Sequence, residues 1–250
     1  MSHNKDTNMI EIKEGAYVIS DAHYSYLRPE LLDFIKEIES KKLQPTQLIL
    51  MGDIFDALFG GIDYTLEKNA EIVKLLNTIS HDIEIIYLEG NHDFNLQDVF
   101  LKVKVFPMKM QPVICQYGDK MVCIAHGDFD GAFFYKLYSA IIRNPSVLFV
   151  LRALDRVLNN YIIKKIDKYL TKKEDCNKFI GFRDFIKKRI SKRSACDYFI
   201  EGHFHQNISF DFDNLRYINL AAFACNQRYF IVKSLQDKEL LEENIFSKGI

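Results

Sequence analysis

The sequence predicts an α/β protein built as a two-sheet sandwich, and three observations support this prediction. Short apolar runs alternate with amphipathic helical patterns between residues 16 and 100. A hairpin and several short strands follow in the later part of the chain, and a long helical segment separates the two strand-rich parts. Strands alternating with helices of this length indicate βαβ units and a largely parallel sheet. We expect residues 1–250 to form one domain, with a helical insertion at about 131–193.

The first half of the chain carries the parallel pattern. Three apolar runs, Ala16–Ser20, Leu48–Met51 and Ile83–Leu88, are predicted to be buried strands. Two helices are expected between them, at Pro29–Lys42 and Leu66–Ile79, because their apolar residues recur at helical spacing.

The second half begins with a hairpin. Val113–Tyr117 and Met121–Ala125 flank Gly118-Asp119, which is typical of a tight turn between two strands. The insertion then reads as helix, broken near Asn144-Pro145 and around Thr171–Asn177. Later strands are expected at Tyr198–Glu201, Phe210–Phe212, Arg216–Leu220 and Phe230–Lys233.

Charge separates the insertion from the rest of the chain. The whole sequence has 33 Lys and Arg against 34 Asp and Glu, a net charge of −1. Residues 131–193 contain 16 basic and five acidic side chains, so their net charge is +11 and the remainder carries −12. A near-neutral total argues against a dedicated nucleic-acid binder. The high apolar content of the basic segment favours lipid over nucleic acid.

Cysteine usage and hydrophobicity indicate a cytosolic protein. The five cysteines, at 115, 123, 176, 196 and 225, are odd in number and irregular in spacing, so we expect free thiols in a reducing compartment. Met1–Glu14 lacks the basic start and apolar run of a signal peptide. No run of 18 uncharged apolar residues is present, so we expect no membrane span.

Polar motifs follow five of the predicted strands. Proteins with α/β sheets place their ligands at the carboxyl ends of strands. One such motif alone occurs by chance, and a lone His-x-His is more often a partly exposed polar pair. Five in order indicate a site. They are Asp21-Ala22-His23, Gly52-Asp53-Ile54-Phe55-Asp56, Gly90-Asn91-His92-Asp93, His126-Gly127-Asp128 and Gly202-His203-Phe204-His205.

These residue types suit two divalent metals held close together. Such a centre needs nitrogen and oxygen ligands from several loops and a carboxylate that bridges the ions. Asp53 can bridge. The remaining ligands divide into Asp21, His23 and His205 for one metal, and Asn91, His126 and His203 for the other.

In order, the five motifs resemble the signature of calcineurin-like metallophosphoesterases. The resemblance covers about residues 16–126 and 197–233. It implies a four-layer α/β/β/α sandwich and two-metal phosphoester hydrolysis, often with Mn²⁺. Within this superfamily the chain is most similar to the UDP-2,3-diacylglucosamine hydrolases of bacterial lipid A synthesis. The closer resemblance is carried by Gly52–Asp56, Gly90–Phe94, His126–Asp128, the long insertion, the total length and Tyr217–Leu220.

The chain departs from that branch at several positions. Many members have Arg where this chain has His92, and many have Trp where it has Ala57–Gly60. Phe129-Asp130-Gly131 replaces their usual polar run. The substrate therefore has an alternative: a general phosphodiesterase, nucleotide hydrolase or protein phosphatase reaction at the same site. A metal-free scaffold is a further alternative, although every expected ligand position is filled.

The expected reaction is hydrolysis of the pyrophosphate of UDP-2,3-diacylglucosamine to lipid X and UMP. Asn91 and the metals would hold the phosphoryl oxygens, and His92 would donate a proton to the leaving oxygen. Asp56 and Asp93 are candidates for orienting imidazoles, with turn capping as the alternative.

The insertion has two interpretations. Val147, Leu148, Leu151, Leu154 and Leu158 form an apolar stripe that could be a small helical core or the inner face of a lid over the metals. As a lid it would accommodate acyl chains, and Arg143, Arg152 and Arg156 would be candidates for binding the substrate. Its basic charge predicts peripheral contact with anionic lipid on the cytoplasmic face of the inner membrane. The sequence gives no indication of the oligomeric state.

Overall fold

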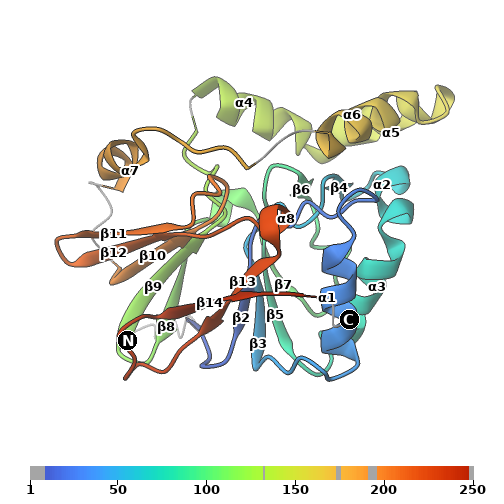
Figure 1. Ribbon diagram of the computed structural model, residues 1–250. Coiled ribbons are helices and arrows are strands. Elements are labelled where there is room, and N and C mark those ends of the chain that lie inside the picture. The colour runs from blue at the N-terminus through green and yellow to red at the C-terminus, as the bar shows by residue number, and fades with distance from the viewer. Residues whose placement is uncertain (1–8, 132, 173–175, 191–195, 248–250) are drawn as a thin grey trace, which may run out of the picture.

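Two six-stranded sheets stacked face to face form the body of the protein (Figure 1). The computed structural model describes residues 9–131, 133–172, 176–190 and 196–247. The strand orders are β14-β13-β2-β3-β5-β7 in the first sheet and β1-β8-β9-β10-β12-β11 in the second. The predicted two-sheet α/β sandwich is confirmed.

The first sheet has a parallel centre. Its parallel strands are β2 (Tyr17–Ile19), β3 (Gln47–Leu50), β5 (Glu84–Leu88) and β7 (Lys104–Phe106). Two antiparallel strands, β13 (Arg228–Val232) and β14 (Leu241–Ile245), complete one edge. Because β2, β3 and β5 are parallel, the loops that follow them meet at one end of the sheet.

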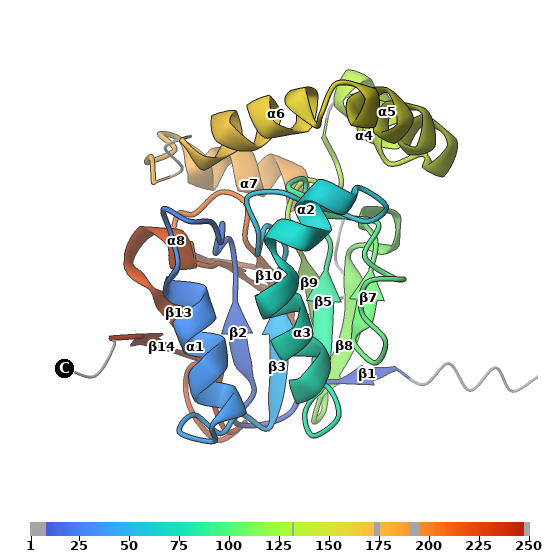
Figure 2. The same cartoon turned by 90° about the vertical axis from the view of Figure 1, so that its right-hand side faces the viewer.

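Helices α1 (Glu30–Glu39) and α3 (Ala70–Ile79) cover the outer face of this sheet, with the short α2 (Asp63–Lys68) above them (Figure 2). Their buried side chains, among them Phe34, Ile35, Ile72 and Leu76, pack on the sheet. The helix predicted at Leu66–Ile79 is two helices in the structure. Asn69 interrupts it, and its side-chain amide donates to the Ala57 and Thr65 carbonyls.

The second sheet supplies the other half of the strand-end loops. It contains β1 (Ile10–Glu11), the predicted hairpin β8 (Val113–Tyr117) and β9 (Lys120–Ala125), then β10 (Tyr198–Glu201), β12 (Leu215–Asn219) and β11 (Ile208–Phe212). Strand β10 runs parallel to both β9 and β12. Val18, Ile49 and Ile86 of the first sheet share one buried cluster with Val122, Ile124 and Ile200 of the second.

Four short elements lie outside this plan. They are too short for a periodic signal, and the sequence pattern did not predict them. They are β4 (Leu58–Phe59), β6 (Asp93–Phe94), the 3-10 turn Met108–Met110 and α8 (Phe223–Asn226).

The insertion divides into two parts. Helices α4 (Phe133–Ile142), α5 (Pro145–Val157) and α6 (Tyr161–Thr171) lie across the end of the sandwich where the strand-end loops gather (Figures 1 and 2). We call these three helices the lid. The predicted break at Asn144-Pro145 is confirmed, because the Asn144 side chain caps α5 by accepting from the Ser146 and Val147 amides. Of the second predicted break, residues 173–175 lie outside the described residues. Within the described chain, no helix has the length and apolar character needed to cross a membrane.

Helix α7 (Phe182–Ile190) belongs to the sandwich instead. Phe182, Ile186 and Ile190 are buried in one cluster with Phe199 and Tyr217 of the second sheet. It therefore forms the outer helical layer on that sheet, and the order of layers is α/β/β/α.

The prediction of five free thiols is wrong for four of them. Cys123 is paired with Cys196, and Cys176 with Cys225, each with Cα atoms 5.9 Å apart. Strands β9 and β10 lie side by side, which brings the first pair together although 73 residues separate them. Cys115 is free and buried. The cysteines therefore no longer argue for a reducing compartment.

If α7 is a layer of the sandwich, shortening its buried face will destabilise the whole domain. Ile186 is fully buried, so Ile186→Ala should lower the free energy of unfolding by about 2–5 kcal/mol. Ile180→Ala is the matched control, since that side chain is 95% exposed and its loss should change stability by less than about 0.5 kcal/mol. Chemical denaturation measures both variants, and equal stability would contradict the assignment of α7 to the sandwich.

Candidate metal centre

The strand-end loops bring the expected ligands together between the two sheets. Asp21 follows β2, Asp53 follows β3, His126 follows β9 and His203 follows β10. Each of these four residues follows a different strand, and the loops after these strands lie at one end of the sandwich, below the lid helices (Figure 1). The polar motifs after parallel strands therefore form a single site.

The backbone at this site adopts an uncommon conformation. Five of the expected ligands have positive φ angles between 46° and 60°, a region that non-glycine residues rarely occupy. Each such residue costs on the order of 1 kcal/mol and persists only where surrounding contacts hold it. The five are Asp21, His23, Asp53, His203 and His205.

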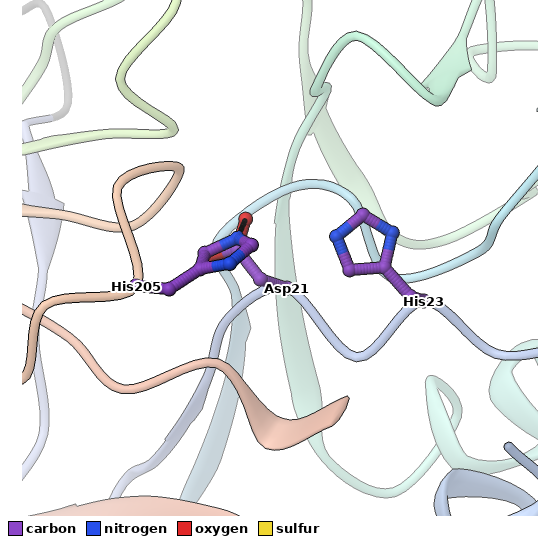
Figure 3. Close-up of side chains that lie close together, drawn as sticks. All are labelled: Asp21, His23 and His205. Atoms are coloured by element: carbon purple, nitrogen blue, oxygen red, sulfur yellow. Dashed lines mark ion pairs between the residues drawn. The ribbon is translucent and has the colours of Figure 1, made fainter. Parts of the chain in front are cut away.

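The first cluster contains Asp21, His23 and His205, with one ligand atom of each within 4.8 Å of the others (Figure 3). The His205 Nε2 atom is 3.0 Å from the Asp21 Oδ1 atom. Burial opposes ionisation of Asp21, but the neighbouring His205 imidazole outweighs it and lowers the pKa of the carboxyl. These are the three residues expected to hold one metal.

The second cluster contains Asp53, His126 and His203 at the same spacing. The His126 Nδ1 atom is 3.0 Å from the Met51 carbonyl oxygen, so it donates there and leaves Nε2 facing Asp53 Oδ2 at 3.4 Å. A backbone partner of this kind fixes the tautomer that a metal-binding imidazole needs.

Asn91 is the remaining expected ligand of the second metal. Its Oδ1 atom is buried and has no hydrogen-bond partner among the described residues. A buried amide oxygen without a partner is unfavourable unless something binds it. Carboxylate, imidazole and amide atoms that converge in this way are the donor set that divalent ions use, so the residues present fit a metal centre.

Two glycines make this convergence possible. A Cβ atom at Gly90 would lie 2.1 Å from the Asp53 Oδ1 atom. One at Gly202 would lie 1.9 Å from the Ser20 hydroxyl oxygen and 2.3 Å from Asp21 Oδ2. The glycines that precede Asn91 and His203 are therefore required by the close approach of neighbouring loops.

Asp93 stabilises the loops through their backbone. It accepts hydrogen bonds from the amides of Asp53, Ile54 and Gly90 and from the Tyr87 hydroxyl. Burial and then the charge of Asp53 raise the pKa of Asp93 to about 7. This differs from the predicted role of orienting an imidazole.

Asp56 does lie beside an imidazole, as predicted. Its Oδ1 atom is 3.5 Å from His23 Nδ1 and accepts from the Arg28 guanidinium at 2.7 Å. Burial opposes its ionisation, but hydrogen bonds from His23 and Ser25 and the Arg28 charge lower the pKa of Asp56.

The position of His92 allows two roles. Its Nδ1 atom is 3.0 Å from the Asp56 carbonyl oxygen, and its ring contacts His23 edge to face at 4.9 Å. His23, Asp56 and His92 also form a third cluster with metal-binding spacing. Geometry alone therefore permits His92 either to bind a metal or to donate a proton.

The three predicted substrate-binding arginines separate in the structure. Arg143 reaches the site: its Nη2 atom donates to the Gly90 carbonyl at 2.8 Å, and its guanidinium lies over the Phe94 ring. Arg152 and Arg156 both pair with Asp63 of α2 instead. They attach α5 to the sandwich at that point.

Arg189 on α7 is a site residue that the sequence did not predict. Its Nε atom donates to both carboxylate oxygens of Asp130 at 2.8 Å, Nη2 donates to the Gly127 carbonyl at 2.7 Å, and Nη1 pairs with Glu201. Gly127 follows the expected ligand His126, and Glu201 is two residues before the expected ligand His203. Arg189 thus connects the loops after β9 and β10 to the outer helix.

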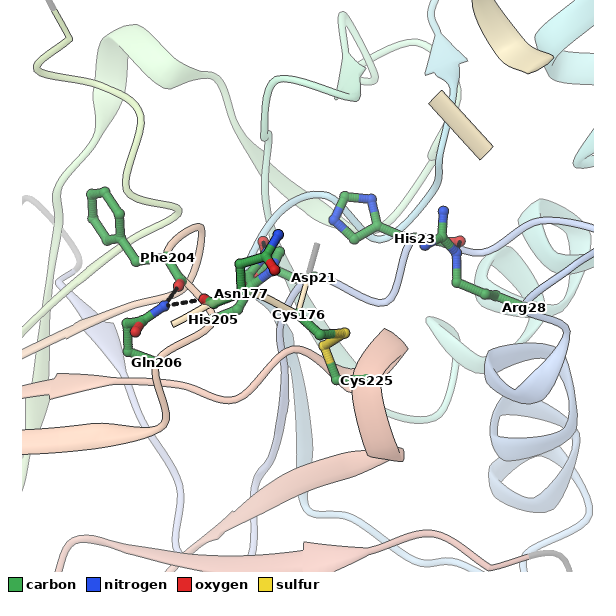
Figure 4. Close-up of a disulfide and its surroundings, with 9 residues drawn as sticks. All are labelled: Asp21, His23, Arg28, Cys176, Asn177, Phe204, His205, Gln206 and Cys225. Carbon is green, nitrogen blue, oxygen red and sulfur yellow. Dashed lines mark hydrogen bonds and ion pairs between the residues drawn. A yellow bond between two sulfur atoms is a disulfide. The ribbon is translucent and has the colours of Figure 1, made fainter. Parts of the chain in front are cut away.

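The chain after α6 is also attached beside the metal ligands (Figure 4). Cys176 is bonded to Cys225 of α8. The Gln206 side chain donates to the Asn177 carbonyl at 3.0 Å and accepts from the Phe179 amide at 2.7 Å. Because Gln206 follows the ligand His205, this segment and the first cluster are held together.

The family model of calcineurin-like phosphoesterases matches residues 16–207, which include every expected ligand. The chain belongs to this family. The family identity agrees with the ordered strand-end motifs and with the layers of the sandwich.

Several curated relatives of this phosphoesterase carry the name UDP-2,3-diacylglucosamine hydrolase. The relative from Pseudomonas fluorescens (strain SBW25) is 26% identical over 152 residues, which span 60% of this chain and 61% of that protein. The relative from Blochmanniella pennsylvanica is 25% identical over 202 residues, spanning 75% of this chain and 78% of that protein. Among solved structures, the chain is similar to Yfce, a phosphoesterase from E. coli, with a TM-score of 0.44, 14% identity, and coverage of 93% of this chain and 99% of that one.

Removing the proposed bridging carboxylate should empty the phosphoesterase site of metal. Asp53→Ala should lose both ions, because Asp53 belongs to the second cluster and its charge also acts on Asp21 and His23 of the first. His92→Ala should keep both ions if His92 donates a proton, and lose metal if it is a ligand. Metal content of the purified, folded variants decides this, with the exposed Asp119→Ala as control. Two tightly bound ions in Asp53→Ala would contradict the ligand assignment.

Metal binding should release a proton and weaken as the pH falls. Burial alone would lower the pKa of His126, but the Asp53 carboxylate outweighs it and raises the pKa well above 6.5. His126 is therefore protonated near neutral pH without metal and must lose that proton to bind one. Below this pKa, affinity should fall about tenfold per pH unit.

Calorimetric titration of metal into the metal-free protein, in buffers of different ionisation enthalpy, measures the number of protons released. The surface variant His81→Asn should behave like the unmodified protein. Metal affinity that is constant between pH 6 and pH 8 would refute the protonated state of His126.

Proposed function

We propose that the chain hydrolyses the pyrophosphate of UDP-2,3-diacylglucosamine, giving lipid X and UMP, as a step of lipid A biosynthesis. One observation carries this proposal: an apolar cavity of about 330 Å³ lies between the lid and the metal-binding loops and opens on Asn91 and His92. The curated relatives that share the name of this activity support the same substrate.

The walls of this cavity are suited to acyl chains. The sandwich contributes Phe59, Ile62 and Phe94, and the lid contributes apolar side chains from all three helices. These lid residues include Ile142 of α4, Leu148 and Leu151 of α5, and Ile163, Ile166 and Leu170 of α6. Burial of apolar surface stabilises a bound chain by about 25 cal/mol per Å². A protein phosphoserine has no apolar group that would use these walls.

Arg143 is placed to hold a phosphate at the mouth of the cavity. It lines the cavity beside Asn91 and His92, and its side chain is 12% exposed. Its Nε and Nη1 atoms are buried and make no hydrogen bond within the described residues. A guanidinium with unused donors is well suited to phosphate oxygens. Arg152 and Arg156 would have to leave Asp63 to reach the substrate.

The reaction assigns distinct tasks to the residues of the site. We propose that the site holds two divalent ions, both Mn²⁺. Asp21, His23 and His205 would hold one ion, Asn91, His126 and His203 would hold the other, and Asp53 would be shared. The ions would activate water and stabilise the charge on the phosphoryl group. The Asp56 carbonyl accepts from His92 Nδ1 and fixes the ring orientation. His92 in its protonated form would then give its Nε2 proton to the leaving oxygen.

The outer surface of the lid supports contact with a membrane. Many of its apolar side chains are exposed, including Phe149, Val157, Tyr161 and Tyr169, and basic residues lie among them. Apolar and basic side chains on one helical surface are typical of proteins that bind anionic lipid interfaces. We therefore place the enzyme in the cytoplasm, at the cytoplasmic face of the inner membrane, where a diacylated substrate would be available.

A substrate panel tests the proposed reaction. Purified protein with Mn²⁺ should release UMP from UDP-2,3-diacylglucosamine much faster than it hydrolyses a nucleotide sugar without acyl chains. Comparable rates on general diesters, nucleotides or phosphopeptides would indicate a general metallophosphoesterase of other specificity.

Introducing charge into the cavity should remove the preference for acyl chains. The double variant Leu148→Asp and Leu151→Asp should lower kcat/KM for the detergent-dispersed diacylated substrate at least tenfold, because both side chains line the cavity. Hydrolysis of bis(p-nitrophenyl) phosphate should change less than about twofold. Phe149→Asp with Val150→Asp is the matched control on α5, since both residues point outward.

That control should reduce binding to vesicles containing anionic lipid while leaving turnover of the dispersed substrate unchanged. If the cavity variant and the control lose the same activity, the cavity does not bind the acyl chains.

A further inference from the structure

A second cavity borders the same metal centre. Its volume is about 480 Å³, and its walls include His203, Phe204, Asp128 and Asp130 together with Phe185 and Arg189 of α7. The apolar cavity under the lid and this one have no lining residue in common among the described residues. Each is bounded by an expected ligand of the same metal, Asn91 for the first and His203 for the second. A molecule occupying both cavities would therefore place the group between its ends at that metal.

We propose that this second cavity binds the nucleoside of the substrate, an inference that rests on the proposed function. UDP-2,3-diacylglucosamine has an acylated sugar at one end, a nucleoside at the other, and a pyrophosphate between them. With the acyl chains under the lid and the pyrophosphate at the metals, the nucleoside must extend from the metals in a direction other than the lid cavity. The second cavity, which borders His203, lies in such a direction.

The walls of the second cavity suit a base. The Phe204 and Phe185 rings meet edge to face with centroids 5.5 Å apart, and both border the cavity. Proteins often bind planar bases through offset or edge contacts with aromatic rings, without hydrogen bonds to every edge of the base. Phe185 is 38% exposed, so part of its ring is available to a ligand.

The charge of the cavity excludes the other parts of the substrate. Two carboxylates, Asp128 and Asp130, and one guanidinium, Arg189, border it. Carboxylates repel phosphate and are poor neighbours for acyl chains, but they accept hydrogen bonds from ribose hydroxyls, as acidic residues do in dinucleotide sites. The neutral nucleoside is thus the part of the substrate that fits this cavity.

Contacts within the protein hold the walls of the cavity in place. Arg189 lies between the Phe129 and Phe204 rings, with its guanidinium carbon 5.1 Å and 5.2 Å from their centroids. The same side chain is bonded to Asp130, Glu201 and the Gly127 carbonyl. Walls that are already ordered lower the entropic cost of binding.

The test compares two phenylalanines of one aromatic cluster. Phe185→Ala removes a ring that lines the cavity. Phe179→Ala removes a neighbouring ring, 5.1 Å from Phe185, that does not line it. Calorimetry measures the affinity of the metal-loaded proteins for UMP and for inorganic phosphate. It also measures the affinity of the metal-free proteins for uridine.

Loss of a stacking ring typically weakens base binding by about 1–3 kcal/mol, or roughly 5- to 150-fold. Phe185→Ala should therefore weaken UMP and uridine binding at least fivefold and raise KM for the full substrate. The same variant should leave kcat, phosphate binding and bis(p-nitrophenyl) phosphate hydrolysis little changed. Phe179→Ala should match the unmodified protein within about twofold, and Phe185→Tyr should keep UMP affinity.

Equal UMP affinity in Phe185→Ala and Phe179→Ala, with normal turnover of the nucleotide substrate, would overturn the nucleoside site and leave the proposed function intact. If the unmodified protein hydrolyses the simple diester but neither binds UMP nor cleaves the nucleotide sugar, the proposed function itself fails. The two failures are therefore distinguishable.

Discussion

The buried carboxylate of Asp53 is the group on which the arrangement of this site depends. Its Oδ1 atom accepts from the His92 amide at 2.8 Å, and its backbone carbonyl accepts from the His23 amide at 3.0 Å. Its own amide donates to Asp93, and Gly90 leaves room for it. One residue thus joins the loops after three parallel strands. Burying this charge is unfavourable unless cations surround it, and the imidazoles of His126 and His92 lower its pKa accordingly.

Local sequence patterns predicted the parts of the molecule that depend on local chemistry. Apolar runs ending in Asp, Asn or His predicted the strands that precede the expected ligands, because a strand end determines where the next few side chains lie. The edge strands β1, β7 and β14 were not predicted. The pairings of Arg189 with Glu201 and of Arg28 with Asp56 join residues far apart in the chain, and no spacing signals them. The cysteine pairs and the assignment of α7 to the sandwich escaped prediction for the same reason. The division of the predicted helix at Asn69 is a local effect that helical periodicity does not register.

The opposite charges of the insertion and the sandwich have a structural explanation. Several basic side chains of the insertion are used inside the molecule: Arg152 and Arg156 meet Asp63, Arg143 approaches Glu89, and Arg189 meets Asp130 and Glu201. One contact runs the other way, from Lys68 of the sandwich to Asp167 of the lid, at 2.6 Å. Charge complementarity therefore attaches the insertion to the sandwich at separate points around the site.

The insertion consists of a lid and a helix of the sandwich, and this division determines which part of it could be replaced by the corresponding part of a relative. Helices α4–α6 can be regarded as a cassette, because they contact the body through cavity walls, ion pairs at its rim and a few hydrogen bonds such as those of Arg143 and Arg28. Helix α7 is not part of this cassette, since it covers the second sheet and Arg189 holds the loops after β9 and β10. A chimaera that borrows the lid of a relative should therefore join the chains between α6 and α7, so that the walls of the apolar cavity are exchanged and the expected metal ligands are kept.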